Sequence, residues 1–275
     1  MTNLLNKIIM LSIKYKLLRP FQKLFSVLGL RLHLTLIDKN KNIQFFDKNI
    51  WIPFVDKKNY YVSLYNENLK KTGKEWSNNF SKELRFYSLF ALADKYSKIN
   101  KYDHFAECGC WHGHSSLSIS KILLKNNFSA TFEIYDSFEG GLSEFSNFDN
   151  NIHKKLDKNE IIKQRNAFSS SEKFVKNILN EYNFVKIYKG WIPAVFKNIN
   201  EKKYQFVHID VDLYEPTNDA LNYFYPKLIN NGLIIVDDYN LSQFPGAKKA
   251  VDDFILNNKI SFFYEVPFGG CFIIK

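Results

Sequence analysis

Four aspartates stand in two pairs near the carboxyl end of the chain. Asp210 and Asp212 follow one apolar run, and Asp237 and Asp238 follow the next one along the chain. If both runs are parallel strands, their carboxyl ends meet at one crevice, and alternation puts Asp210 and Asp212 on one face. Carboxylates so crowded repel one another unless an oxygen-binding divalent cation neutralises them. We therefore predict a metal site with one carboxylate left as a base; the alternative is that these acids cap helices or meet lysines.

A glycine-containing turn follows an earlier apolar run. It begins at Glu107, contains Gly109, Cys110 and Gly113, and leads directly into a helical segment. Glycine lets the backbone turn sharply and approach a ligand, and the start of a helix offers unpaired N–H groups. Glu107 would repel a pyrophosphate and suits a ligand with an ammonium and a sulfonium, which favours S-adenosylmethionine over NAD. These four residues are our first candidates for cofactor binding.

Other strand ends extend the predicted cofactor site. Asp136 and Ser137 end a second run, where a carboxylate can accept hydrogen bonds from ribose hydroxyls; capping the next helix is the alternative role. Gly190 and Trp191 end a third run, where the indole would stack on adenine or pack in the core. Asp210 completes the predicted set.

The elements that must position these residues begin near residue 80. Strand-like runs occupy 104–110, 131–138, 185–191, 204–214, 233–239, 261–266 and 271–274, and helical periodicity occupies 81–97, 115–125, 171–182 and 216–228. This alternation predicts an α/β fold with a mostly parallel, doubly wound sheet. Because only four residues separate the last two runs, they must form a hairpin that adds one antiparallel strand.

The first 80 residues differ from the rest of the chain. They are irregular and aromatic-rich, and predict an N-terminal appendage that packs on a domain formed by residues 81–275. Residues 4–37 indicate basic amphipathic helices, which either pack or dimerise or lie on a membrane surface. A faint likeness to a signal peptide lacks a small-residue cleavage site. No run of about 18 apolar residues occurs, so we expect no transmembrane helix.

Composition narrows the choice of partner and compartment. A formal charge of +10 points to acidic partners such as nucleic acid, anionic lipid or phosphorylated glycan. Few of the basic residues are arginine and none interleave with base-stacking aromatics, so we expect no nucleic acid and prefer a lysine-rich solvated surface. Three cysteines fit a reducing cytoplasm. Cys108 and Cys110 form a C-x-C, a candidate redox or metal pair, although the glycine turn explains the segment better.

The remaining candidates are histidines and one long segment. Residues 139–170 have the character of a lid over the substrate, with lysines that either meet an anionic glycan or form a solvated face. Single histidines are mostly structural; His208 shares a strand face with Asp210 and is a candidate supporting residue for the metal site.

Several motifs occur in the order typical of one family. They are the glycine turn, D-S-F-E-G at 136–140, K-G-W at 189–191, I-D-V-D-L-Y at 209–214, Y-P-K-L at 225–228, V-D-D-Y at 236–239 and K-A-V-D-D-F at 249–254. Over residues 104–275 the chain resembles the macrocin O-methyltransferase family. The resemblance implies a class I methyltransferase fold that uses S-adenosylmethionine to methylate a hydroxyl of a sugar or glycan, in a polysaccharide, lipopolysaccharide or natural product.

The same resemblance implies roles for the four aspartates. Mg²⁺ would be held by the residues matching Asp210, Asp237 and Asp238, and Asp212 would be the general base. The chain departs from the family in the glycine turn, where W-H-G-H replaces W-R-G-G, and after Gly140, where Gly141 is inserted. The second departure falls in the region that defines the acceptor.

Two other classes of protein compete with this interpretation. Asp210-Val211-Asp212 is also the D-x-D pattern of a metal-dependent glycosyltransferase, although a methyltransferase-like turn precedes it. A binding or assembly protein that kept the fold is disfavoured because all four acids are present. We expect a cytoplasmic enzyme, peripheral at the inner membrane face if the N-terminus binds lipid, and leave a homo-oligomer open.

Overall fold

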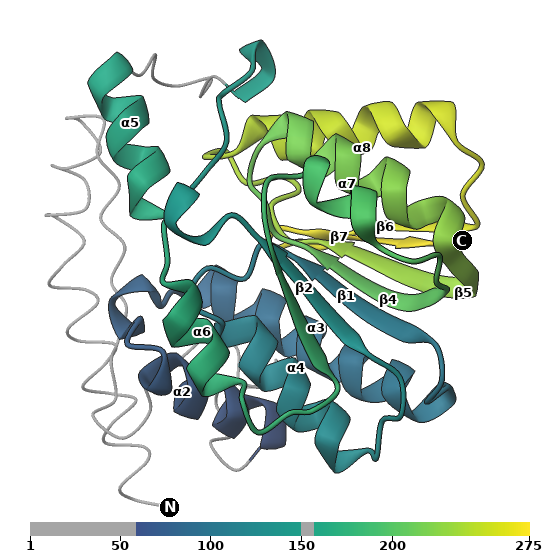
Figure 1. Ribbon diagram of the computed structural model, residues 1–275. Helices are drawn as coiled ribbons and strands as arrows, with labels where there is room; N and C mark the ends of the chain where they lie inside the picture. The colour runs from purple at the N-terminus through teal and green to yellow at the C-terminus, as the bar shows by residue number, and fades with distance from the viewer. Residues whose placement is uncertain (1–58, 150–156) are drawn as a thin grey trace, which may run out of the picture. The chain divides into compact units, whose positions relative to one another are not determined.

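A computed structural model describes residues 59–149 and 157–275 and has a seven-stranded sheet at its centre (Figure 1). In spatial order the strands are β3 (Val185–Lys189), β2 (Phe132–Asp136), β1 (His104–Cys108), β4 (Tyr204–Ile209), β5 (Leu228–Val236), β7 (Cys271–Ile274) and β6 (Phe262–Glu265). Strand β7 runs antiparallel to both of its neighbours, and the other pairs are parallel. The predicted α/β fold with a C-terminal antiparallel strand is confirmed.

Helices cover both faces of the sheet (Figure 1). On one face α2 (Tyr60–Lys71), α3 (Phe80–Ile99) and α4 (His114–Lys125) pack against one another, and on the other α7 (Tyr214–Phe224) packs against α8 (Pro245–Asn257). Helices α5 (Lys158–Ala167) and α6 (Glu172–Ile178) lie between β2 and β3 in the sequence. Short 3-10 helices occupy Glu75–Ser77, Phe138–Gly140, Asn147–Asp149, Ala194–Asn198 and Tyr225–Lys227.

The order of the strands determines where a ligand site forms. From β1 the chain moves outward to β2 and β3 and then returns to place β4 on the other side of β1. At such a switch point the connections leave β1 and β4 in opposite directions, which opens a crevice at their carboxyl ends. Strands β1 and β4 are almost wholly buried, so close packing on both faces of the sheet fixes the position of this crevice.

Several element bounds differ from those predicted. Strand β4 ends at Ile209 rather than continuing to residue 214, and β5 already begins at Leu228. Helices α5 and α8 were not among the predicted helices; α5 lies in the predicted lid, and α8 contains the K-A-V-D-D-F motif.

The predicted N-terminal appendage is described only in part. The amphipathic segment at 4–37 lies outside the described residues, so its packing or membrane role stays a prediction, as does the division at residue 80. Helix α2, which falls within the first 80 residues, packs against α3 and α4. Within the described part of the chain, no helix combines the length and the apolar character needed to cross a bilayer.

Candidate active site

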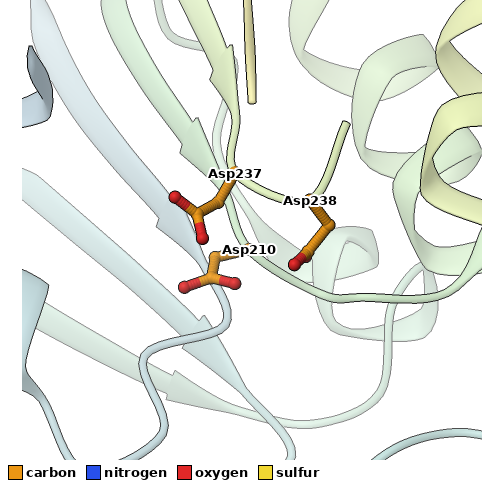
Figure 2. A group of neighbouring side chains, drawn as sticks. All are labelled: Asp210, Asp237 and Asp238. Atoms are coloured by element: carbon orange, nitrogen blue, oxygen red, sulfur yellow. The ribbon is translucent and has the colours of Figure 1, made fainter. Parts of the chain in front are cut away.

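Three carboxylates meet where β4 and β5 end (Figure 2). Asp210 is the first residue after β4, and Asp237 and Asp238 follow β5 directly. One oxygen from each lies within 4.8 Å of the others. The backbone N–H groups of Asp210 and Asp237 still donate to neighbouring strands, to Cys108 at 2.8 Å and Ile209 at 2.9 Å. The sheet ladder therefore fixes where two of the three acids lie.

Asp212 joins this group through a turn and not through strand alternation. Its φ of 62° lies in the left-handed region, which aspartate tolerates better than most residues. Its backbone N–H donates to the carboxylate of Asp238 at 3.1 Å. Asp212 and Asp210 line the same two cavities, so the prediction that they lie together is confirmed. The reason given for it, alternation along a strand, was wrong, because Asp212 lies in a turn.

The electrostatics of the group show a shortage of positive charge. Burial, reinforced by the neighbouring carboxylates, raises the pKa of Asp210, Asp212 and Asp238 well above the ordinary value. Asp237 differs, because the Arg85 guanidinium holds its pKa below the ordinary value although burial opposes this. Arg85 donates to both oxygens of Asp237, at 3.0 and 2.9 Å. Carboxyl groups that resist ionising for want of a positive partner fit a divalent cation held by Asp210, Asp237 and Asp238.

The glycine turn approaches the same strand end. Gly109 has a φ of 80°, and a Cβ placed on it would lie 1.8 Å from the carbonyl oxygen of Asp210. Only glycine fits there, because the turn and the end of β4 are in backbone contact. Gly113, with a φ of 78°, caps α4 and faces Ile178 of α6 instead of a cavity. Of the two glycines predicted in this turn, only Gly109 lines the crevice.

Asp136 ties the glycine turn to β2. One of its oxygens accepts the backbone N–H groups of Cys110 at 2.7 Å and Trp111 at 3.0 Å, and the other accepts that of Phe138. A carboxylate offers about four lone-pair positions, so one stays available for a ribose hydroxyl. The capping alternative is also seen in part, since Phe138 begins a 3-10 helix.

Two cavities meet along this edge of the sheet. The first is a cleft that contains predicted cofactor residues from all three strand ends, Asp136, Ser137, Gly190, Trp191 and Asp210. The second, of about 620 Å³, contains Cys110 and all four aspartates. Gly109, Trp111 and Phe168 line both, so the two form one continuous site.

Glu107 does not line either cavity. It is fully buried, and its carboxylate accepts from the Ser116 hydroxyl and contacts His208 Nδ1 at 2.9 Å. Glu107 and His208 are register partners on β1 and β4, directly behind the glycine turn and Asp210. This pair supports the strands beneath the site, and a direct role for Glu107 in cofactor binding stays a prediction.

The predicted lid is anchored over the site by its described parts. Arg165 Nε donates to the carbonyl of Leu142 at 2.9 Å, and Leu142 packs with Phe244 beside the cleft. Asp149, which is buried, accepts the backbone N–H of Tyr214 at 2.8 Å. The lid lysines at 154 and 155 lie outside the described residues.

Several residues of the site were not predicted. They include Arg85, which neutralises Asp237, and Lys74 and Lys82, which line the larger cavity. One sequence signal for Arg85 exists: arginine is rare in this lysine-rich chain, and a forked contact with a carboxylate requires it. The C-x-C alternative gains no support, because burial raises the pKa of the Cys108 and Cys110 thiols and both are free.

Comparison with known proteins identifies the class of this site. Residues 57–264 match the family model described as "Macrocin-O-methyltransferase (TylF)". The chain belongs to the macrocin O-methyltransferase family. It is therefore an S-adenosylmethionine-dependent O-methyltransferase, as predicted, and the glycosyltransferase and binding-protein alternatives fall away. The roles of individual residues stay predictions.

Individual relatives agree with this family. The chain is 25% identical over 205 residues to demethyldecarbamoylnovobiocin O-methyltransferase of Streptomyces niveus, covering 70% of this chain and 74% of the relative. It is 26% identical over 153 residues to 8-demethyl-8-(2,3-dimethoxy-alpha-L-rhamnosyl)-tetracenomycin-C 4'-O-methyltransferase of Streptomyces olivaceus, covering 54% of this chain and 56% of that relative. The chain thus spans a little over half the length of this second relative.

Solved structures share the fold. The O-methyltransferase NovP superposes with a TM-score of 0.55 at 22% identity, covering 76% of this chain and 88% of its own. The calicheamicin methyltransferase CalS11 gives a TM-score of 0.54 at 13% identity, with 76% and 91% covered. At these identities the likeness concerns the fold.

Proposed function

We propose that this methyltransferase transfers the methyl group of S-adenosylmethionine to a sugar hydroxyl, with Mg²⁺ held by Asp210, Asp237 and Asp238 and with Asp212 as the general base. The observation that carries the proposal is the group of three carboxylates within 4.8 Å, beside a cleft lined by the glycine turn. The name of the tetracenomycin relative includes a rhamnosyl group, which supports a sugar as the acceptor.

The protein's own residues divide the work between two sides of the site. Gly109, Asp136 and Trp191 line the cleft in which the nucleoside part of the cofactor would lie. When bound, S-adenosylmethionine supplies an electrophilic methyl group on a sulfonium. The acceptor would lie in the larger cavity, beside the aspartates. Rate then comes mainly from holding the two reactants in line.

The acidic group prepares the acceptor hydroxyl. When bound, Mg²⁺ supplies a Lewis acid that lowers the pKa of a coordinated hydroxyl. Asp212, buried at the edge of the same cavity, would accept the proton that the acceptor hydroxyl loses. Arg85 keeps Asp237 ionised and therefore able to act as a ligand.

The test uses the full chain with Mg²⁺ or with a chelator. We expect S-adenosylhomocysteine to bind in calorimetry, and labelled methyl to pass from S-adenosylmethionine to a member of a sugar panel only when Mg²⁺ is present. Transfer that persists at full rate in the chelator would remove the metal from the proposal. Binding of the cofactor product without transfer to any sugar would remove the sugar acceptor.

A further inference from the structure

The larger cavity carries opposite charges on different parts of its lining. The four aspartates lie on one part, at the strand ends, while Lys74 and Lys82 lie on another, contributed by the α2–α3 connection and the start of α3. At about 620 Å³ the cavity is large enough for a substrate of several rings. Asp210 and Asp237 attract the Lys82 ammonium from across the cavity. A cation held by the aspartates would offset that attraction and leave the lysines available to an anionic part of the substrate.

The two lysines lack an acidic partner. Among residues 59–149 and 157–275 neither Lys74 nor Lys82 forms a salt bridge, whereas Arg85 in the same lining is paired with Asp237. Lys82 Nζ donates to the Ser77 hydroxyl at 3.1 Å, and Lys74 Nζ lies 4.4 Å from the centroid of the Trp111 ring. Burial lowers the pKa of both lysines. A bound anion would offset this cost of keeping them charged.

An exposed aromatic ring lies beside the lysines. Trp76 is 74% exposed, belongs to the lining of the same cavity and packs edge-on against Trp111 at 6.0 Å between centroids. Lys74 Nζ lies 5.5 Å from the centroid of its ring. Lysines next to an exposed indole are suited to bind phosphate oxygens while the ring stacks on a nucleobase.

We propose that the acceptor is a sugar linked to a nucleoside diphosphate. Its diphosphate would contact Lys74 and Lys82, its base would stack on Trp76, and its sugar hydroxyls would reach the aspartates. This inference rests on the proposed function. The transfer forms an oxygen–carbon bond, breaks the methyl–sulfur bond and passes the hydroxyl proton to Asp212, so the diphosphate remains intact.

The test is calorimetry on the full chain saturated with S-adenosylhomocysteine, with Mg²⁺ in cell and syringe. The titrants are UDP, dTDP, GDP and inorganic pyrophosphate. We expect at least one nucleoside diphosphate to bind more tightly than pyrophosphate. Replacing Lys74→Met and Lys82→Met together should weaken that binding about ten- to hundredfold, as expected for lost charge-assisted hydrogen bonds. Trp76→Ala should weaken the nucleoside diphosphate but not pyrophosphate.

Controls separate this inference from its rivals. Lys71→Met, an exposed residue at the end of α2 outside the cavity lining, should leave all affinities unchanged. Unchanged affinity for S-adenosylhomocysteine in the double variant shows that it folds. If the double variant instead loses S-adenosylhomocysteine but keeps methylthioadenosine, the lysines bind the cofactor's carboxylate and the inference is overturned.

Two further outcomes also count against it. Pyrophosphate could bind as tightly as every nucleoside diphosphate, and Trp76→Ala could leave all of these affinities unchanged. The acceptor would then be a simpler phosphorylated sugar and not a nucleotide sugar. A wild-type protein that binds S-adenosylhomocysteine but no diphosphate would sink the inference and leave the proposed function standing. Failure to bind S-adenosylhomocysteine at all would instead count against the proposed function.

Discussion

Buried carboxylates occur in two regions of this protein, with opposite electrostatic outcomes. Glu133 on β2 is fully buried, yet it accepts the hydroxyls of Tyr135 at 2.9 Å and Tyr204 at 2.6 Å and pairs with Lys202. Although burial raises it, these partners hold the pKa of Glu133 below its ordinary value. The charge of Glu133 is fully compensated within the protein.

The aspartates at the ends of β4 and β5 are not compensated in this way. Within the described residues Asp237 alone among them has a salt bridge, and the pKa values of the other three are raised. Buried charge without a partner destabilises a fold, so it persists where a ligand supplies the missing charge. Glu133 is thus an acid that the protein itself neutralises, whereas the aspartates are acids for which we propose a divalent cation as the missing positive charge.

The largest effect should come from Asp212→Asn. Asparagine also tolerates a φ of 62° and keeps the shape, so the variant should fold and bind S-adenosylhomocysteine normally. Loss of the base should lower kcat about 10²- to 10⁴-fold. Single-turnover methyl transfer measures this, with Asp219→Asn on α7, outside both cavities, as the matched control. Full activity in the Asp212 variant would contradict the base assignment.

Magnesium should stabilise the aspartate group and leave the Glu133 region unaffected. At Mg²⁺ one hundred times above its Kd, the free energy of unfolding should rise by about 2.7 kcal/mol. Asp238→Asn should remove most of this increment. Replacing Asp237 is a poorer test, because it would leave the Arg85 guanidinium without its carboxylate partner. Thermal unfolding with Mg²⁺ or chelator measures both, and Glu133→Gln, the control, should keep the full increment. An undiminished increment in Asp238→Asn would exclude it as a ligand.

Asp136 represents a third case, a half-buried acid that accepts three backbone N–H groups while burial still raises its pKa. In Asp136→Asn the side-chain NH₂ faces a backbone N–H group, at Phe138 or at Cys110 and Trp111. The glycine turn should loosen, and the affinity for S-adenosylhomocysteine should fall about ten- to hundredfold. Calorimetry tests this against Glu139→Gln, an exposed acid of the following turn. Equal affinities would show that Asp136 does not shape the cofactor cleft.

The aspartates could be predicted from the sequence because each pair follows a run that reads as a strand. Once β4 and β5 are neighbours, the ladder brings Asp210, Asp237 and Asp238 together without further information. Asp212 was placed correctly for the wrong reason, since a left-handed turn and not strand periodicity directs it. The local sequence pattern predicts the existence of a strand more reliably than it predicts the residue at which the strand ends.

Contacts across the fold could not be predicted in the same way. Arg85 and Asp237 are 152 positions apart, and no periodicity links a residue of α3 to the end of β5. Lys74 and Lys82 resemble the other lysines of the chain until the structure places them in the cavity. Glu107 shows the converse: its position in the motif is typical of a cofactor residue, but its partners are Ser116 and His208.

The smallest effect should come from Glu133→Gln, which tests the compensated half of the comparison. Loss of the charge weakens the hydrogen bonds from Tyr135 and Tyr204 and the pair with Lys202, and should lower the free energy of unfolding by about 1–2 kcal/mol at pH 7. Methyl transfer should not change, because Glu133 lines neither cavity of the site.

The difference in free energy of unfolding between wild type and Glu133→Gln should depend on pH. The folded pKa of Glu133 is lowered, so its contribution is present in full above the unfolded value of about 4.3 and is lost as the pH falls through the folded value. Denaturant unfolding of wild type and variant should therefore give curves separated by a constant amount from pH 5 to 8 that converge in acid. A separation that grows in acid would mean that the Glu133 charge is a burden on the fold, as we infer for Asp210, Asp212 and Asp238, and the two regions would no longer differ in kind.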